Sequence, residues 1–288
     1  MDNIKTIGVA GCGIIGSGIA QVAAAAGYAT VMREVTDDAL KAGTTRIKRF
    51  VESAVNKKVI ELAVGDAMLA RIKTTLKLGD MENCDIVIEA APENIRLKKE
   101  IFTDLDVICG KDCILASTTS AYSIAELAGA TNRPDKVVGL HFFNPVPVVR
   151  LVEIVKTFDT SESALRRVRS FVESLGKTAV SVKDSPGFVV NRLLIPYLLD
   201  AIRLYEAGVA SLDDIDTAVK QGCQHPSGPL QLADSMGLDV VLSLADTLYE
   251  EFREQRYAAP PLLRHMVAAG KLGRKSGKGF YNYEKAQP

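Results

Sequence analysis

Residues 4–34 read IKTIGVAGCGIIGSGIAQVAAAAGYATVMRE. A short apolar run leads into glycines at positions 11, 13 and 16, and an alanine-rich segment follows them. A second apolar run then ends at Glu34. This order predicts a buried strand, a tight glycine turn, a helix that packs closely on a sheet, and a second strand.

The glycines have the spacing G-x-G-x-x-G, which is weak evidence by itself. Here they stand between a predicted strand and a predicted helix, with an acidic residue at the end of the next strand, which is the setting of a dinucleotide site. The turn lets the backbone approach a diphosphate, and the helix N-terminus supplies N–H groups. The residues expected at the diphosphate are Gly11, Gly13, Ile14, Ile15 and Gly16.

Glu34 is expected to accept hydrogen bonds from the adenosine ribose. Its negative charge would repel a 2′-phosphate, which favours NAD over NADP as the cofactor. The neighbouring Arg33 points the other way, because an arginine at this place could tolerate that phosphate.

The composition is that of an ordinary globular chain. Of its 288 residues 47% are hydrophobic, and 35 basic side chains balance 35 acidic ones, so no overall positive field attracts nucleic acid or an anionic membrane. The apolar stretch 7–27 is too rich in glycine for a membrane span. Five cysteines, an odd number without zinc-site spacing, are typical of reduced thiols and of a cytoplasmic protein without a metal site.

Residues 37–58 have helical periodicity, with apolar side chains on one face. A solvated surface is the usual meaning of a basic face, and a binding surface for a polyanionic substrate is the alternative. The basic residues assigned to the opposite face are Arg46, Lys48, Arg49, Lys57 and Lys58.

Two further strands are predicted before residue 121. The strand 85–90 ends in small residues, where a nicotinamide ribose could pass Ala91, and Glu93 and Lys98 follow on the next helix. The second strand ends in the hydroxyl-rich stretch STTS, which closes at Ser120. Ligands of open parallel sheets bind at the carboxyl ends of the strands, so these side chains are expected at the site.

His141 and Glu153 each stand in an otherwise apolar strand, and the NPVP turn between them predicts an antiparallel pair. A buried carboxylate that accepts the Nδ1–H bond of the imidazole would leave Nε2 as a general base. A purely structural His–Glu link fits the same residue types.

The break DSPG begins at Asp184, and helical periodicity dominates beyond it. The sequence therefore predicts an α/β domain, 1–184, with a Rossmann-type doubly wound sheet, and an all-α domain, 185–288. The hydrophobic helical domain is expected to bury part of its surface against a partner. A site is expected in the cleft between the two domains, which is a usual place for ligand sites. The basic segment GRKSGKGF reads as a flexible tail or as a segment that closes over the cofactor.

Seven stretches in order resemble the L-3-hydroxyacyl-CoA dehydrogenases, and among them the bacterial 3-hydroxybutyryl-CoA dehydrogenases. They cover essentially the whole chain, and HFFNP at 141–145 and DSPGFVVNR at 184–192 are more diagnostic than the glycine turn. The other stretches are GCGIIGSGIAQVAAAAGY, IVIEAAPENIRLKKEIF, ILASTTSAYSI, DIDTAVKQG and GRKSGKGFYNY.

The resemblance implies roles for individual residues. His141 matches the catalytic histidine and Glu153 its orienting glutamate, while Ser120 and Asn191 match the groups that position the substrate oxygens. Glu93, Lys98, Ser120, Asn144 and Lys275 match cofactor contacts. Lys57 or Lys58 matches the lysine that meets the CoA phosphates. The resemblance also implies that the helical domain forms a homodimer.

The expected reaction is the reversible oxidation of a (3S)-3-hydroxyacyl-CoA, with 3-hydroxybutyryl-CoA as the expected short-chain substrate, to the 3-oxoacyl-CoA by NAD. One rival is a dehydrogenase of a free hydroxy or sugar acid on the same fold. A second rival is a non-enzyme that binds NAD for a structural or sensing role.

Overall fold

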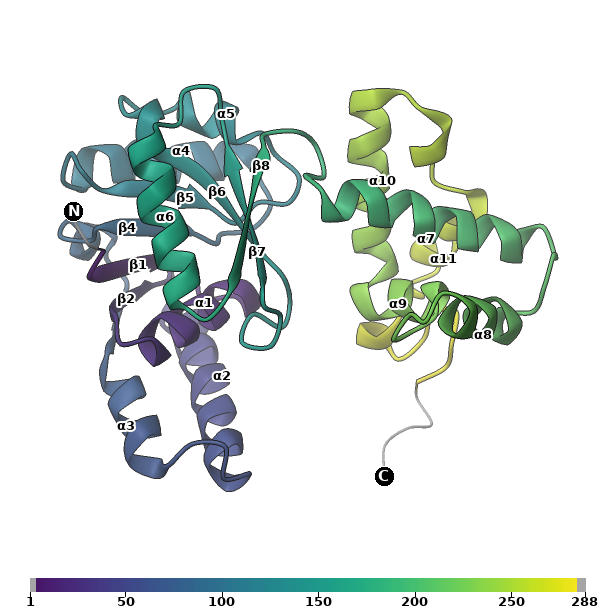
Figure 1. Ribbon diagram of the computed structural model, residues 1–288, viewed down its shortest axis with the longest axis horizontal. Coiled ribbons are helices and arrows are strands. Elements are labelled where there is room, and N and C mark those ends of the chain that lie inside the picture. The colour runs from purple at the N-terminus through teal and green to yellow at the C-terminus, as the bar shows by residue number, and fades with distance from the viewer. Residues whose placement is uncertain (1–3, 284–288) are drawn as a thin grey trace. The chain divides into compact units, whose positions relative to one another are not determined.

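The computed structural model describes residues 4–283. The chain divides into two compact units, Met1–Ser185 and Pro186–Pro288 (Figure 1). The boundary lies inside the DSPG stretch, one residue after the predicted division at Asp184.

The first unit is built on an eight-stranded sheet in the order β3-β2-β1-β4-β5-β6-β7-β8. All neighbouring strands are parallel except β6 and β7, which are antiparallel. The sheet is therefore the predicted Rossmann-type sheet, extended at one side. The strands are β1 (Thr6–Ala10), β2 (Ala29–Arg33), β3 (Ile72–Thr75), β4 (Ile86–Glu89), β5 (Ile114–Ser117), β6 (Val137–Phe142), β7 (Leu151–Lys156) and β8 (Thr178–Lys183).

Helices cover both faces of this sheet, with α6 in front and α4 and α5 behind in Figure 1, while α2 and α3 project beyond the sheet. The helices are α1 (Ile14–Ala25), α2 (Asp37–Asn56), α3 (Leu62–Ala70), α4 (Ile95–Ile108), α5 (Ile124–Ala128) and α6 (Glu162–Ser174). Short 3₁₀ turns are η1 (Leu78–Met81) and η2 (Pro134–Lys136).

Strand composition explains why the sheet is the core of this unit. The central strands β4, β5 and β6 are buried along their whole length, as expected for strands covered on both faces. The small side chains of α1 let it approach the sheet closely, and Ala20, Ala23 and Ala24 are fully buried. Asn94 caps α4 by accepting from the N–H groups of Arg96 and Leu97.

The second unit is helical, as predicted. Its helices are α7 (Val190–Glu206), α8 (Leu212–Gly222), α9 (Pro229–Met236), α10 (Leu238–Phe252) and α11 (Pro261–Ala268), with the 3₁₀ turns η3 (Gln255–Tyr257) and η4 (Arg274–Ser276). Buried leucines, isoleucines and Tyr257 form its own apolar core. Ser211 caps α8 by accepting from the Asp214 N–H.

Candidate active site

The glycine turn joins β1 to α1 and has the shape that a diphosphate requires. Gly11 has φ +117°, and a Cβ on Gly16 would overlap the Gly11 carbonyl oxygen. A Cβ on Gly13 would meet no atom within 4 Å and would instead fill the space above the turn. No side chain caps α1 at Gly13, so the turn can present its backbone N–H groups to an anion. These residues fit the diphosphate of a dinucleotide.

Glu34 lies beside this turn, at the end of β2. Its two carboxylate oxygens accept hydrogen bonds from the N–H groups of Cys12 and Val35, each at 2.8 Å. The carboxylate is thus fixed next to the turn, where a ribose hydroxyl can donate to it. Arg33 donates from Nε to the Leu76 carbonyl oxygen at 3.4 Å. Burial, followed by the Glu34 charge, raises the pKa of the Cys12 thiol to about 12, so this thiol stays protonated.

Arg46 lies on the exposed basic face of α2, as the helical pattern predicts, and it also reaches the glycine turn. Its guanidinium donates to the Cys12 carbonyl oxygen at 3.0 Å and to the Ser17 hydroxyl at 3.1 Å. The pattern within α2 did not predict these contacts, because both acceptors lie outside that helix. The guanidinium places a positive charge at the glycine turn, where it favours a bound diphosphate.

Lys57 and Lys58 lie away from this turn. The helix α2 ends at Asn56, Lys57 is its C-cap, and Lys58 follows with φ +55°. Both are exposed, and they lie between the end of α2 and the start of α3 at Leu62. They belong to the connection between two helices rather than to the helical face on which the sequence placed them.

The carboxyl ends of β4 and β5 bring three expected cofactor contacts together. Glu93 accepts a hydrogen bond from the Ser120 N–H at 2.9 Å. The Lys98 ammonium lies 3.5 Å from the Glu93 carboxylate and donates to the Ala91 carbonyl oxygen at 3.1 Å. Strand pairing explains the convergence, because Glu89 and Ser117 are Cα partners at the ends of these strands.

His141 and Glu153 form the pair that the turn sequence predicts. They are direct Cα partners in the antiparallel β6–β7 ladder, and Nδ1 of His141 lies 2.7 Å from a Glu153 carboxylate oxygen. Both are buried, with 6% and 1% of their surface exposed. The Phe143 ring packs against the imidazole at a centroid distance of 4.5 Å.

The loop between β6 and β7 carries Asn144, whose side chain is exposed. A buried lysine that sequence reasoning missed holds this loop. Lys177 donates from Nζ to the carbonyl oxygens of Val146 at 2.6 Å and Val149 at 2.7 Å. Val146 also packs against α1, where a Cβ on Gly18 would lie 2.7 Å from the Val146 Cβ. The loop beside the histidine is thereby attached to the cofactor-binding helix.

In the second unit, Asn191 is buried in the first turn of α7, with 6% of its surface exposed. Lys275 pairs with Asp239 at 2.6 Å. The segment around it is not the flexible tail that its sequence suggests. Asp234, 1% exposed, accepts hydrogen bonds from the N–H groups of Phe280 and Tyr281 at 3.0 and 2.9 Å.

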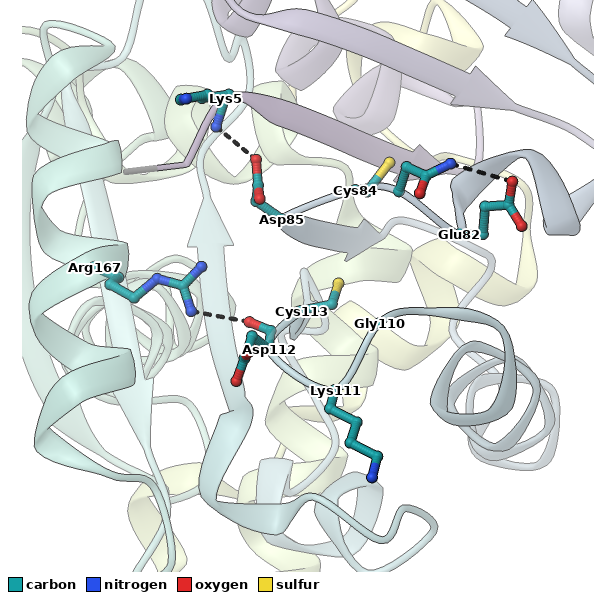
Figure 2. A pocket seen from close by; sticks show the side chains of 10 residues that line it. Lys5, Glu82, Cys84, Asp85, Gly110, Lys111, Asp112, Cys113 and Arg167 are labelled. Carbon is teal, nitrogen blue, oxygen red and sulfur yellow. Dashed lines mark hydrogen bonds between the residues drawn. The ribbon is translucent and has the colours of Figure 1, made fainter. Parts of the chain in front are cut away.

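A cavity of about 630 Å³ lies at the opposite edge of the sheet, before β1, β4 and β5 (Figure 2). Its charges are mixed, and some are already satisfied, since Asp85 accepts from the Lys5 N–H and Arg167 donates to the Asp112 carbonyl oxygen. None of the predicted site residues lines it, so the candidate chemistry belongs to the carboxyl edge. Its lining residues are Lys5, Glu82, Asn83, Cys84, Asp85, Gly110, Lys111, Asp112, Cys113 and Arg167.

The described part of the chain contains neither a group of metal ligands nor a membrane-spanning helix. Among residues 4–283, no three His, Cys, Asp or Glu side chains are grouped in a way that could hold a metal ion. Over the same residues, no helix is both long enough and apolar enough to cross a membrane.

Comparisons with known proteins identify the family. Residues 6–185 match the NAD-binding domain of 3-hydroxyacyl-CoA dehydrogenase, and residues 187–283 match its C-terminal domain. The 3-hydroxybutyryl-CoA dehydrogenase of Mycobacterium tuberculosis is 47% identical over 284 residues, 98% of this chain and 99% of that protein. The mitochondrial hydroxyacyl-coenzyme A dehydrogenase of Homo sapiens is 43% identical, over 98% of this chain and 92% of that protein.

The fold agrees over the same length. The crystal structure of (S)-3-hydroxybutyryl-CoA dehydrogenase from Ralstonia eutropha has a TM-score of 0.95 at 44% identity, and the match covers 98% of this chain and all of that one. The glycine turn and Glu34 fit the cofactor that the matched domain binds, which is NAD. A sheet with this cofactor site, joined to the matching helical domain, makes the chain a member of the 3-hydroxyacyl-CoA dehydrogenase family, NAD-dependent oxidoreductases.

Proposed function

We propose that this enzyme interconverts (3S)-3-hydroxybutyryl-CoA and acetoacetyl-CoA with NAD and NADH. The buried contact between His141 and Glu153 carries the proposal, because it supplies a base at the carboxyl edge of the sheet. The names of relatives that align over nearly the whole chain support the substrate, and the (S) enzyme of Ralstonia eutropha supports the stereochemistry.

His141 acts as the general base in this proposal. With Glu153 ionised, the 2.7 Å contact is a hydrogen bond from Nδ1–H to the carboxylate, and this tautomer makes Nε2 the basic nitrogen. Nε2 removes the proton of the substrate 3-hydroxyl, and the Glu153 charge stabilises the imidazolium that forms. Bound NAD would supply the acceptor for the hydride from C3. In the reverse direction the imidazolium returns the proton to the 3-oxo oxygen.

Further residues take positioning roles in the proposal. Ser120, whose N–H is held by Glu93, and Asn191 orient the substrate oxygens. Asn144 and Lys275 contact the cofactor, together with the glycine-turn residues, Ile14, Ile15 and Ala91.

Lys57 and Lys58 bind the CoA phosphates. A double change of both lysines to methionine should raise KM for acetoacetyl-CoA about tenfold, the equivalent of about 1.4 kcal/mol of lost binding. It should leave KM for the N-acetylcysteamine thioester unchanged, because that substrate lacks the phosphates.

We also propose that the second unit forms a homodimer. Leu193 and Val209 are 70% and 67% exposed, and Val240 is 41% exposed, so burial of these apolar side chains against a second copy would stabilise a dimer. Light scattering at micromolar concentration should give twice the chain mass of 31.0 kDa, and Leu193→Glu should shift the mass toward the monomer. A monomeric unchanged protein would contradict this proposal.

The substrate is tested by following NADH absorbance with acetoacetyl-CoA, free acetoacetate and added CoA. The proposal predicts turnover of the thioester, competitive inhibition by CoA, and little turnover of the free acid. Equal turnover of acetoacetate without inhibition by CoA would favour the free-acid dehydrogenase. Oxidation of the (3R) thioester in preference to the (3S) thioester would overturn the stereochemistry.

A further inference from the structure

Glu89 is a charged residue in the interior of the first unit. It is the last residue of β4, between β1 and β5, and none of its surface is exposed. An ionised carboxylate removed from water is costly unless hydrogen bonds and an opposite charge compensate it. The groups that compensate this buried charge therefore indicate its role.

Both oxygens of the Glu89 carboxylate are engaged. Oε1 accepts from Lys98 Nζ at 2.8 Å and from the Ala91 N–H at 2.6 Å. Oε2 accepts from the Ser117 hydroxyl at 2.6 Å. The carboxylate thus joins the ends of β4 and β5, the turn at Ala91 and the helix α4.

Lys98 is buried to the same degree, with 1% of its surface exposed. Its ammonium donates to Glu89 and to the Ala91 carbonyl oxygen, and it lies 3.5 Å from the Glu93 carboxylate. An ammonium has three donors, and two of them are used within the protein, by Glu89 and by the Ala91 carbonyl oxygen, while the Glu93 carboxylate is an ion-pair contact. The geometry is that of an ion pair that fixes its neighbours.

Glu93 links the buried pair to the surface of the protein. Its side chain is 44% exposed, so one end of the network reaches the surface at the site. Its carboxylate accepts from the Ser120 N–H at 2.9 Å and from the Thr119 hydroxyl at 3.0 Å. A continuous series of contacts therefore runs from Glu89 through Lys98 and Glu93 to the backbone of Ser120.

We propose that Glu89 and Lys98 are a pair of positioning residues for the reaction, acting through Glu93 to hold Ser120 in place. This inference rests on the proposed function for the role of Ser120. The pair works as a unit, because either partner alone would leave an uncompensated buried charge that draws in water or moves the loop. A displacement of about 1 Å at a reacting group can cost about 10²-fold in rate.

The test is a double-mutant cycle with Glu89→Gln, Lys98→Met and the double variant. Each single variant should lose about 10- to 100-fold in kcat/KM for acetoacetyl-CoA. The double variant should lose no more than either single one, because residues that act through one another give non-additive effects. Lys99→Met is the matched control, since the next lysine of α4 pairs on the surface with Glu126 at 2.7 Å and should keep full activity.

Thermal unfolding separates positioning from simple loss of stability. Removing both charges together should restore much of the melting temperature that either single change lowers. A merely structural pair predicts that activity returns with the melting temperature in the double variant, and the positioning pair predicts that it does not. Two results would overturn the inference. One is a loss of kcat/KM in the double variant equal to the product of the two single losses, and the other is Glu89→Gln activity within about twofold of the unchanged enzyme.

A further variant and a binding measurement test the pair even if the charged-residue variants fail to fold or the proposed function is wrong. Ser117→Ala removes the hydroxyl that donates to Glu89 and accepts from the Thr119 N–H, without leaving a charge unpaired. It should fold and should lower kcat/KM in the same direction, and unchanged activity would count against the pair. NADH fluorescence titration reads the placement of the same loop without any reaction. If the unchanged protein does not turn over acyl-CoA, the proposed function fails, while a non-additive cycle in the NADH dissociation constant still supports the pair and an additive one overturns it.

Discussion

Glu153 lies directly opposite His141 in the antiparallel ladder, and its carboxylate is 2.7 Å from Nδ1 of the imidazole. Because the register of a buried strand pair is fixed by packing, the ladder aligns the two side chains before any ligand binds. A base oriented in this way needs little reorganisation to accept a proton, which is the basis of the catalytic role proposed for it.

Glu153→Gln is expected to lower kcat about 10²- to 10⁴-fold, because an amide neither fixes the tautomer nor stabilises an imidazolium. The NADH dissociation constant should stay within about twofold, since Glu153 acts on the base rather than on the cofactor. Stopped-flow turnover and NADH fluorescence titration measure the two quantities. A variant with more than half of the normal kcat would show that the contact is only structural.

Glu34 is expected to determine the choice between NADH and NADPH. Glu34→Ala should lower the ratio of kcat/KM for NADH to that for NADPH about tenfold, because about 1.4 kcal/mol of charge repulsion against the 2′-phosphate is lost. Arg33→Ala is the control for the opposite influence, and should raise the same ratio. An unchanged ratio in Glu34→Ala would mean that the carboxylate does not face the ribose.

Gly18→Ala should disturb the attachment of the β6–β7 loop to α1. The added methyl group would press on Val146, and overpacking of this kind costs about 1–3 kcal/mol of stability. A lower melting temperature and a higher KM for NADH are expected, because Asn144 lies in the same loop. Gly110→Ala is the control, since a Cβ there meets no atom within 4 Å. Equal behaviour of the two variants would contradict the close contact.

Sequence patterns were sufficient for features that depend on neighbours along the chain. The glycine turn, the strand after it, and the His141–Glu153 pair each arise from one continuous stretch, so their geometry follows from local rules. Residues that depend on distant partners were missed. Glu89 looks like an ordinary strand end in the sequence, yet its buried carboxylate accepts a hydrogen bond from Ser117, 28 residues later. Likewise the contacts of Arg46 could not be predicted from its own helix, because the acceptors lie in the glycine turn and in α1.

The same limit applies to the segment GRKSGKGF at 273–280. The glycines and lysines of GRKSGKGF indicate flexibility when read alone. The structure shows order there because Asp234, 46 and 47 residues earlier, accepts the backbone N–H groups of Phe280 and Tyr281. The predicted roles of Asn191 and Lys275 stay predictions.

Lys177 gives a prediction for the dependence of stability on pH. Burial lowers the pKa of its ammonium below the ordinary value of 10.5, so the folded protein holds this proton less tightly than the unfolded chain does. Its contribution to the free energy of unfolding should therefore grow as the pH rises from the folded pKa to about 10.5, and should be lost as the pH falls through the folded pKa.

Urea unfolding of the unchanged protein and of Lys177→Met between pH 8 and 10.5 measures this contribution as a difference. The difference in the free energy of unfolding should increase toward alkaline pH in favour of the unchanged protein. A difference that shrinks with rising pH would mean that the neighbouring carbonyl oxygens raise the pKa more than burial lowers it.

The central claim is that His141 is the base of the reaction, and His141→Asn tests it most directly. Single-turnover oxidation of NADH with acetoacetyl-CoA should slow by about 10²- to 10⁴-fold in this variant, while its NADH dissociation constant and melting temperature stay close to those of the unchanged enzyme. A hydride-transfer rate within about tenfold of normal, with NADH bound as before, would contradict the claim, because a positioned general base contributes at least about 10²-fold.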